Sequence, residues 1–342
     1  MTKLKVAVIG AGSIAKYRHL PEYKANPQTE IVAICDINEA RAKEMAAHYE
    51  IKHVFTDYKE LLKEDLDIVS VCLPNYLHAP VSIAASEAGC HVLVEKPMAT
   101  SSEEAEAMIA AAKQAGKLLM VGHNQRFVPS HQKAKELLAS GELGKVHTFR
   151  TAFGHGGPEG WSADGKDSWF FRKEEAFIGA MGDLGVHKAD LIRHILGEEV
   201  VEVGAMVEQT AKENSDVDDN AICILKTESG IIGTLTASWS YKGQEDNSTI
   251  IYAEKGSIRL EDDPEYSVII NYLDGTKDKQ ALGKIQTNED GGQNNSGVID
   301  HFVTSILNGT EPLITGEEGK KSLEVILGAL KSSESKQIIR LR

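Results

Sequence analysis

The stretch VAVIGAGSIA, residues 6–15, joins an apolar run to a turn that contains two glycines. The run VAVIG is apolar on both faces, which is typical of a strand in a parallel sheet that helices cover on both sides. In the turn, Gly10 permits a sharp bend, Gly12 lets the backbone approach a pyrophosphate, and Ala15 lets the next helix pack on the strand. Tight packing alone can also produce such a pattern. We expect four residues of this turn to contact a bound dinucleotide: Gly10, Gly12, Ser13 and Ile14.

The alternation of apolar runs with amphipathic segments continues to about residue 122. The later runs are EIVAICD, DIVSVCLP, HVLVEKP and LLMVGH. After HVLVEKP, Ser101 and Glu104 form a capping-box pair and Gly116 stands where a C-terminal cap belongs, which predicts a helix between them. This order predicts an α/β fold that begins with a Rossmann domain, a doubly wound parallel sheet, over residues 1–122.

An acidic residue ends the second of these runs. Asp36 follows Gly12 by 24 residues, close to the spacing at which a carboxylate accepts hydrogen bonds from the adenosine ribose. A carboxylate there would repel the 2′-phosphate of NADP, and the next two residues, Ile37 and Asn38, offer no cation to receive it. The sequence therefore favours NAD over NADP, with a plain strand-end turn residue as the alternative for Asp36.

From about residue 145 the pattern changes to strands joined by short polar or glycine turns. These strands include VVEVGAMVEQ, AICILKT, GIIGTLTASWS, STIIYAE and GSIRLED. They predict a second α/β domain over residues 123–342, built on a large, mostly antiparallel open sheet. Alternating apolar residues in the strands of residues 200–260 leave one face of that sheet to be covered.

The bulk composition restricts the class of protein. The chain has 342 residues, enough for two domains, and a net charge of −14, which argues against nucleic acid or an anionic membrane as a partner. No signal sequence or membrane-length apolar run is found, so we expect a cytoplasmic protein. The four cysteines form no CxxC pair and no HExxH cluster is present, so we expect no metal.

The stretch GAMGDLGVHKAD, residues 179–190, places Asp183 and His187 four positions apart. Four residues are a little over one helical turn, so the two side chains share a helical face and can act on one partner. The alternative is a helix start capped by Asp183, with His187 as a structural residue.

Three blocks together resemble the Gfo/Idh/MocA family of NAD(P)-dependent oxidoreductases: VIGAGSIA, the triplet Glu95-Lys96-Pro97, and GAMGDLGVHKAD. The PNYLH segment and the C-terminal tail extend the resemblance over nearly the full length. It implies a Rossmann domain followed by an open-sheet domain whose outer face forms a homodimer or homotetramer. It also implies Lys96 as the catalytic lysine, with Asp183 and His187 as its partners. Beside the cofactor it implies Asn75, His78, Glu95 and, again, Lys96. One departure is Gly179-Ala180-Met181-Gly182, where many members have three consecutive glycines.

Hydride transfer from a secondary alcohol needs a base for the hydroxyl proton and a group that stabilises the developing oxyanion. A histidine titrates near neutrality, so His187 suits the first role, and the ammonium of Lys96 suits the second. Asp183 would orient His187 or hold a neighbouring substrate hydroxyl.

The segment FGHGGPEGWSADGKDSWFF, residues 153–171, is rich in glycine, polar groups and tryptophan, as sugar-binding loops are. We expect His155, Trp161 and Asp164 on the substrate side and Trp169 beside the nicotinamide, with interface or core roles for the tryptophans as the alternative. In HNQRF, Asn124 and Arg126 follow the last parallel strand and would border the substrate, although a structural role for Arg126 fits equally well.

We expect the protein to be an NAD-dependent dehydrogenase that acts on a ring hydroxyl of a sugar or inositol. The alternatives are an NAD(P)H-dependent reductase of a keto- or anhydro-sugar, a noncatalytic NAD-binding sensor, and an enzyme that keeps and recycles its NAD. Fold alone does not choose among them, because function depends on the site.

Overall fold

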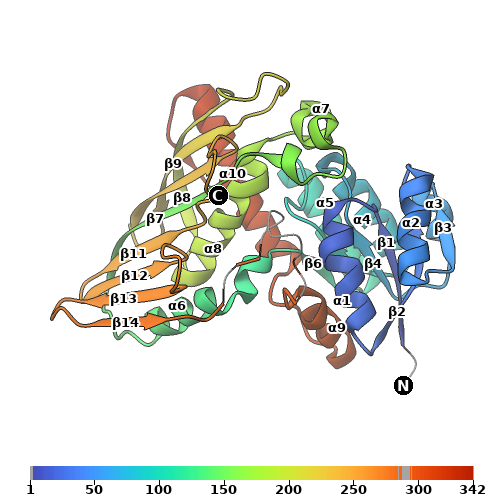
Figure 1. Ribbon diagram of the computed structural model, residues 1–342, viewed down its shortest axis with the longest axis horizontal. Helices are drawn as coiled ribbons and strands as arrows, with labels where there is room; N and C mark the ends of the chain where they lie inside the picture. The colour runs from blue at the N-terminus through green and yellow to red at the C-terminus, as the bar shows by residue number, and fades with distance from the viewer. Residues whose placement is uncertain (1–2, 284, 287–292, 294, 342) are drawn as a thin grey trace. The chain divides into compact units, whose positions relative to one another are not determined.

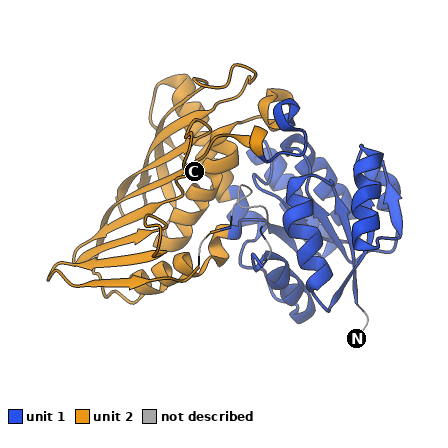
Figure 2. Cartoon of the chain, in the orientation of Figure 1, with its two compact units in different colours: residues 1–124, 161–169, 286–320 blue, residues 125–160, 170–285, 321–342 orange. Residues whose placement is uncertain are grey.

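A computed structural model describes residues 3–283, 285–286, 293 and 295–341 of the chain. The chain divides into two compact units, which Figure 2 shows in different colours. Unit 1 comprises residues 1–124, 161–169 and 286–320, and unit 2 comprises residues 125–160, 170–285 and 321–342. Unit 1 thus ends its first segment near the expected boundary at residue 122, and it also takes in two later segments.

The sheet of unit 1 has six parallel strands in the order β3-β2-β1-β4-β5-β6 (Figure 1). The strands are β1 Leu4–Ile9, β2 Thr29–Cys35, β3 His53–Phe55, β4 Ile68–Val71, β5 His91–Val94 and β6 Leu119–Val121. Every residue of β4 and β6 is buried, because helices cover both faces of a doubly wound sheet. The predicted Rossmann fold is confirmed.

The helices of unit 1 up to α5 follow the strands in alternation, whereas η5 and α9 belong to its two later segments. They are η1 Ala15–His19, α1 Leu20–Ala25, α2 Glu39–Tyr49, α3 Tyr58–Leu61, η2 Asn75–Leu77, α4 His78–Glu87, α5 Ser102–Ala115, η5 Gly165–Asp167 and α9 Val298–Asn308. At α5 the side chain of Ser101 accepts the Glu104 N–H at 3.1 Å, and Gly116 ends the helix at a φ of 66°. Both predicted caps are therefore present.

The sheet of unit 2 has nine strands in the order β14-β13-β12-β11-β7-β10-β9-β8-β15. The strands are β7 Val146–Gly154, β8 Val200–Glu208, β9 Asn220–Thr227, β10 Ile232–Ser238, β11 Thr249–Ala253, β12 Gly256–Leu260, β13 Val268–Tyr272, β14 Lys277–Gln280 and β15 Ile339–Arg340. Only β7 and β10 pair in parallel among these strands, so the mostly antiparallel open sheet is also confirmed.

Helices pack on one face of this sheet (Figure 1). The helices and helical turns within unit 2 are η4 Pro158–Gly160, α6 Pro129–Ala139, α7 Lys173–Ala176, η7 Met181–Gly185 and α8 Val186–Leu196. Of these, α6, η7 and α8 contact the strands of the sheet. Three elements have residues in both units: η3 Asn124–Phe127, η6 Trp169–Phe171 and α10 Gly316–Ser335. Along β9 the inward residues Cys223 and Leu225 are buried, whereas Ile222 and Ile224 on the outer face are exposed.

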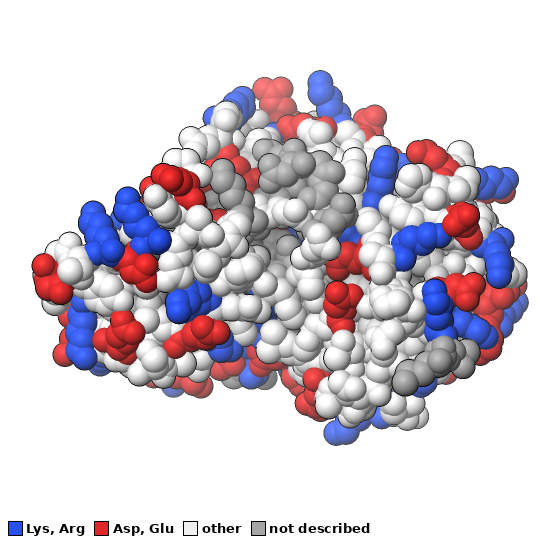
Figure 3. All heavy atoms as spheres, turned by 60° about the horizontal axis from the view of Figure 1, so that its bottom comes forward, with Lys and Arg blue, Asp and Glu red and all other residues white. Residues whose placement is uncertain are grey.

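The surface carries both signs of charge. Figure 3 shows acidic and basic side chains interspersed over the face that it draws, so the net charge of −14 is not gathered into one patch there. Among the described residues, no helix combines the length and the apolar character needed to cross a membrane.

Candidate active site

The glycine turn after β1 has the geometry expected of a dinucleotide loop. Gly10 has a φ of +97°, and a Cβ atom there would lie 2.2 Å from the carbonyl oxygen of Cys72, so only glycine fits. At Gly12 a Cβ atom would meet nothing within 4 Å, which leaves open space in front of the backbone. The loop therefore fits a pyrophosphate that approaches the backbone at Gly12.

Asp36 is joined to this loop through its carboxylate. Its Oδ2 atom accepts the Ala11 N–H at 2.7 Å and its Oδ1 atom accepts the Asn38 N–H at 2.8 Å. Asp36 thus links the end of β2 to the glycine turn, which is more than the role of a plain turn residue. The next side chain, Ile37, is 94% exposed, an apolar group beside the expected ribose position.

Trp161 and Asp164 lie in unit 1, within the segment of residues 161–169, which we call the strap. The Ser13 hydroxyl donates to the Trp161 carbonyl oxygen at 2.8 Å, and Asp164 forms an ion pair with Arg41 at the start of α2. Trp169 is the last residue of the strap. The structure therefore brings Trp161 and Asp164 together with the residues expected to bind the dinucleotide.

Asn75 and His78 follow β4 in unit 1, and both are buried. The His78 ring nitrogens lie 2.7 Å from the Pro97 carbonyl oxygen and 2.8 Å from the Leu73 carbonyl oxygen. Through these two contacts the ring links the segments that follow β4 and β5. Burial lowers the pKa of His78, whereas the two carbonyl groups act to raise it. Asn124, also buried, follows β6.

The carboxyl ends of β4 and β5 meet at one edge of the parallel sheet, and Glu95 and Lys96 follow β5 there. Lys96 is half-buried. Glu95 is buried and accepts a hydrogen bond from Arg18 at 3.1 Å and from His19 at 2.8 Å. Burial alone would raise the pKa of Glu95, but the Arg18 charge, His19 and Lys96 lower it to about 2. Glu95 is therefore an ionised, buried side chain that Arg18 and His19 hold in place directly before Lys96 in the chain.

Asp183 lies in unit 2, in η7, a π-helical turn that directly precedes α8. Its Oδ2 atom accepts a hydrogen bond at 3.1 Å from Nε1 of Trp239, a fully buried residue. The residue at the N-cap position of η7 is Ala180, so Asp183 does not act as the helix cap. The tryptophan instead holds the carboxylate in place.

His187, in the first turn of α8, is buried beside Phe153, with ring centroids 5.8 Å apart. The Phe153 ring lies 5.9 Å from the ring of His155. The Nδ1 atom of His155 accepts the Gly157 N–H at 2.9 Å, which places the proton of the neutral ring on Nε2. Unit 2 therefore gathers two of the expected histidines around one aromatic ring.

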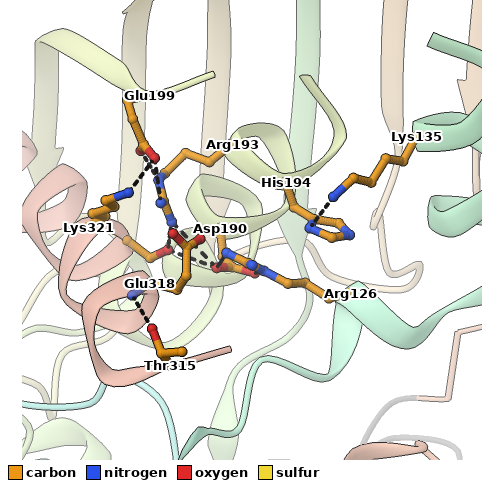
Figure 4. A network of polar contacts seen from close by, with 10 residues as sticks. Arg126, Lys135, Asp190, Arg193, His194, Glu199, Thr315, Glu318 and Lys321 are labelled. Carbon is orange, nitrogen blue, oxygen red and sulfur yellow. Dashed lines mark hydrogen bonds and ion pairs between the residues drawn. The ribbon is translucent and has the colours of Figure 1, made fainter. Parts of the chain in front are cut away.

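Arg126 also lies in unit 2, in a buried network with α8 and α10 (Figure 4). Its Nε and NH2 atoms donate to the two oxygens of Asp190 at 2.9 and 2.8 Å. Asp190 also accepts from Ser322 at 2.9 Å, and Arg193 donates to Ser322 at 2.7 Å. Arg126 is thus engaged in fixing α8, the helix that carries His187.

Two family models match the sequence in chain order. The first, an oxidoreductase family with an NAD-binding Rossmann fold, matches residues 4–123, and the second, the GFO/IDH/MocA C-terminal domain, matches residues 131–259. The chain belongs to the Gfo/Idh/MocA family. It is an NAD-binding oxidoreductase of that family, as the resemblance of its motifs implies.

Relatives within the Gfo/Idh/MocA family cover most of the chain. A myo-inositol 2-dehydrogenase of Thermotoga maritima is 28% identical over 99% of this chain and 98% of its own. A 4-carboxy-2-hydroxymuconate-6-semialdehyde dehydrogenase of a Sphingobium strain is 32% identical over 70% of this chain and 73% of its own. A levoglucosan dehydrogenase solved with NADH and L-sorbose has a TM-score of 0.87 at 25% identity, covering 100% of each chain.

Asp218 holds the backbone of residues 179–182, where many family members have three glycines, and no sequence pattern had indicated this role. Its two carboxylate oxygens accept the N–H groups of Gly179 and Met181 at 2.7 and 2.8 Å. A Cβ atom at residue 179 would lie 1.9 Å from the Asp218 carbonyl oxygen, so that position requires glycine. Burial raises the pKa of Asp218 to about 6, although the hydrogen bonds from the two N–H groups act to lower it. The paired acids Asp218-Asp219 just before β9 were the available signal.

Lys188 is a second residue of this region that no sequence pattern had indicated. It follows His187 directly, is fully buried, and donates to the Asn247 carbonyl oxygen at 2.8 Å. Burial lowers its pKa to about 7, although the surrounding acids Asp246 and Glu261 oppose the shift. A lysine in an otherwise regular helical pattern gives no sign of this burial, because periodicity does not report a hydrogen bond to a distant loop.

The buried Glu95 side chain leads to a pH-dependent prediction. Glu95→Gln is expected to cost about 1–3 kcal/mol at pH 7, because Arg18 loses its buried charged partner. The folded pKa lies below the usual 4.5, so this stabilisation is present above the usual pKa and is lost as pH falls toward the folded value of about 2. In urea unfolding, the difference in the free energy of unfolding between wild type and variant should therefore become smaller as the pH falls from about 5 to about 3. A gap independent of pH would contradict the assignment, and Glu30→Gln, at an exposed site, is the control.

Proposed function

We propose that the enzyme is an NAD-dependent dehydrogenase that oxidises a ring hydroxyl of a sugar or cyclitol. The observation that carries the proposal is the histidine pair around Phe153, together with the carboxylate of Asp183, which Trp239 holds four residues before His187 in the chain. The buried Phe153 ring holds the two imidazoles in place, and imidazole and carboxylate groups are polar groups that can bind the hydroxyls of a sugar. The names of the relatives, myo-inositol 2-dehydrogenase and levoglucosan dehydrogenase, support this substrate class.

The proposed chemistry divides the work among three side chains. The loop of Gly10 and Gly12 would hold NAD, which would supply the acceptor for the hydride of the carbinol carbon. His187 takes the hydroxyl proton, so that the alcohol leaves as a ketone. The ammonium of Lys96 stabilises negative charge on the reacting oxygen, and Asp183 holds the imidazole or a neighbouring hydroxyl in orientation. Asp36 would accept hydrogen bonds from the adenosine ribose of the bound dinucleotide.

The test is NADH production at alkaline pH across inositols, aldoses, 1,5-anhydro sugars and sugar phosphates, with NADP in parallel. Turnover of one cyclitol or sugar with NAD supports the proposal and names the substrate. Silence across the panel, despite tight NADH binding, would contradict it. NADPH oxidation with a keto- or anhydro-sugar would instead indicate a reductase, and NAD that stays bound through purification would indicate a recycling enzyme.

We also propose that a second copy of this chain covers the outer face of the sheet of unit 2. Met206, Ile222 and Ile224 are 72%, 61% and 58% exposed on that face. The strand register places Met206 directly beside Ile222, so the exposed side chains form a continuous apolar patch. Patches of this kind on a soluble protein are usually buried by a partner.

Charges placed in the patch test this assembly. Ile222→Glu together with Ile224→Glu is expected to convert a dimer or tetramer into monomer, because the same carboxylates would face one another across a symmetric interface. Light scattering after size-exclusion chromatography measures the mass. Leu307→Glu, at an exposed leucine of α9 in unit 1, should leave the mass unchanged. A monomeric wild type, or variants that still assemble, would contradict the proposal.

A further inference from the structure

Two contacts attach the strap to the rest of unit 1, and both involve segments that would bind the dinucleotide. At one end the Trp161 carbonyl oxygen accepts the hydroxyl of Ser13 in the phosphate loop. Three residues later, Asp164 pairs with Arg41. The first contact lies where a pyrophosphate would bind, and the second lies on the helix that follows the ribose-binding aspartate.

Arg41 lies close to the expected ribose along a short chain of hydrogen bonds. The Asn38 N–H donates to Asp36 Oδ1 at 2.8 Å, and the Arg41 N–H donates to Asn38 Oδ1 at 3.1 Å. Arg41 is therefore in the first turn of α2, and the N-cap residue Asn38 connects it to Asp36, the carboxylate that would hold the ribose. In Rossmann domains an arginine near this point accommodates the 2′-phosphate of NADP, because guanidinium binds phosphate through paired N–H donors.

Asp164 engages that guanidinium. The side chains of Arg41 and Asp164 are 23% and 43% exposed, so water screens the pair in part and its effect on a competing phosphate is moderate rather than complete. Asp164 opposes such a phosphate in two ways, since it holds the guanidinium and it brings a second negative charge to the first turn of α2, the helix that follows Asp36. Neither Ile37 nor Asn38 offers a cation in its place.

We propose that Asp164 determines dinucleotide specificity: by pairing with Arg41 it keeps the guanidinium from the 2′-phosphate of NADP and so favours NAD. The strap thus acts with Asp36 in choosing the cofactor. Trp161 and Ser13 hold the strap in register, so that Asp164 reaches α2.

The test is the equilibrium binding of NADH and NADPH, followed by fluorescence titration, which needs no substrate. Asp164→Asn is expected to lower the ratio of the NADPH Kd to the NADH Kd by about threefold to tenfold, because Arg41 is released and one negative charge is removed. The NADH Kd should change by less than about twofold, which also shows that the variant is folded. Failure of the substrate panel above would leave this result unaffected.

Two further variants show whether Arg41 is the group responsible. In Asp164→Asn/Arg41→Gln the gain for NADPH should disappear, whereas Arg41→Gln alone should leave the ratio within about twofold of wild type. Asp167→Asn, at an exposed carboxylate of the same strap, controls for simple loss of charge. The proposal is overturned if Asp164→Asn leaves the ratio unchanged, if the gain persists without Arg41, or if Asp167→Asn produces an equal gain.

Discussion

His187→Ala is expected to lower turnover by about 10²–10⁴-fold, while the Kd for NADH stays within about threefold of wild type. Alanine removes the group proposed to take the hydroxyl proton, and nothing in the dinucleotide loop of unit 1 changes. Lys96→Ala should lose about 10²–10³-fold, because the oxyanion loses its positive partner. Steady-state kinetics with the substrate found in the panel, and fluorescence titration with NADH, measure the two quantities.

His155 provides the matched control for this prediction. Its ring lies against the same Phe153, but its Nδ1 atom is used by the Gly157 N–H, so it is a binding group in the proposal. His155→Ala should therefore raise KM more than it lowers kcat. If His187→Ala or Lys96→Ala retains most of its turnover, or if His155→Ala loses as much as His187→Ala, the roles are assigned wrongly.

Asp190→Ala is expected to destabilise unit 2 by about 3–5 kcal/mol, the usual cost of removing one member of a buried ion pair. The change leaves the guanidinium of Arg126 buried without its two carboxylate acceptors and takes a partner from Ser322. Because α8 carries His187, activity should be lost at temperatures where the wild type is still folded. Denaturant unfolding monitored by circular dichroism measures the effect.

A double-mutant cycle separates the pair from the site. Asp190→Ala combined with Arg126→Met should be less destabilised than the sum of the two single variants, because no uncompensated charge remains. Glu202→Ala, which removes a half-exposed partner of Lys226, should cost about 1 kcal/mol or less. Additive effects at Asp190 and Arg126 would show that the network contributes little.

Much of the fold could be predicted from the sequence, because its signals are local. The glycines of the first turn, the caps of α5 and the alternation along β9 depend on residues that are neighbours in the chain or on one strand. The carboxyl-end position of Lys96 follows likewise from the parallel sheet. Asp183 and His187 lie in consecutive helical elements, and a π-helical turn rather than a capped helix start carries the aspartate.

The partners of these residues could not be predicted in the same way. Trp239 lies 56 residues from Asp183, Asp218 lies 37 residues from Met181, and Asp164 lies 123 residues from Arg41. No periodicity links such pairs, since each contact depends on which strands become neighbours and on which buried donor finds an acceptor.

The sequence by itself determined the two sheet types, the dinucleotide loop, the acid at the end of β2 and the family. Backbone conformation and hydrophobic period are enough for these features, because they act over a few residues. Only the tertiary structure decided that the strap belongs with the Rossmann sheet, that Arg126 fixes α8, and that Trp239 and Asp218 hold the turn of Asp183. Those choices arise from long-range pairing of buried polar groups, whose cost when unpaired selects one arrangement among many that the local pattern allows.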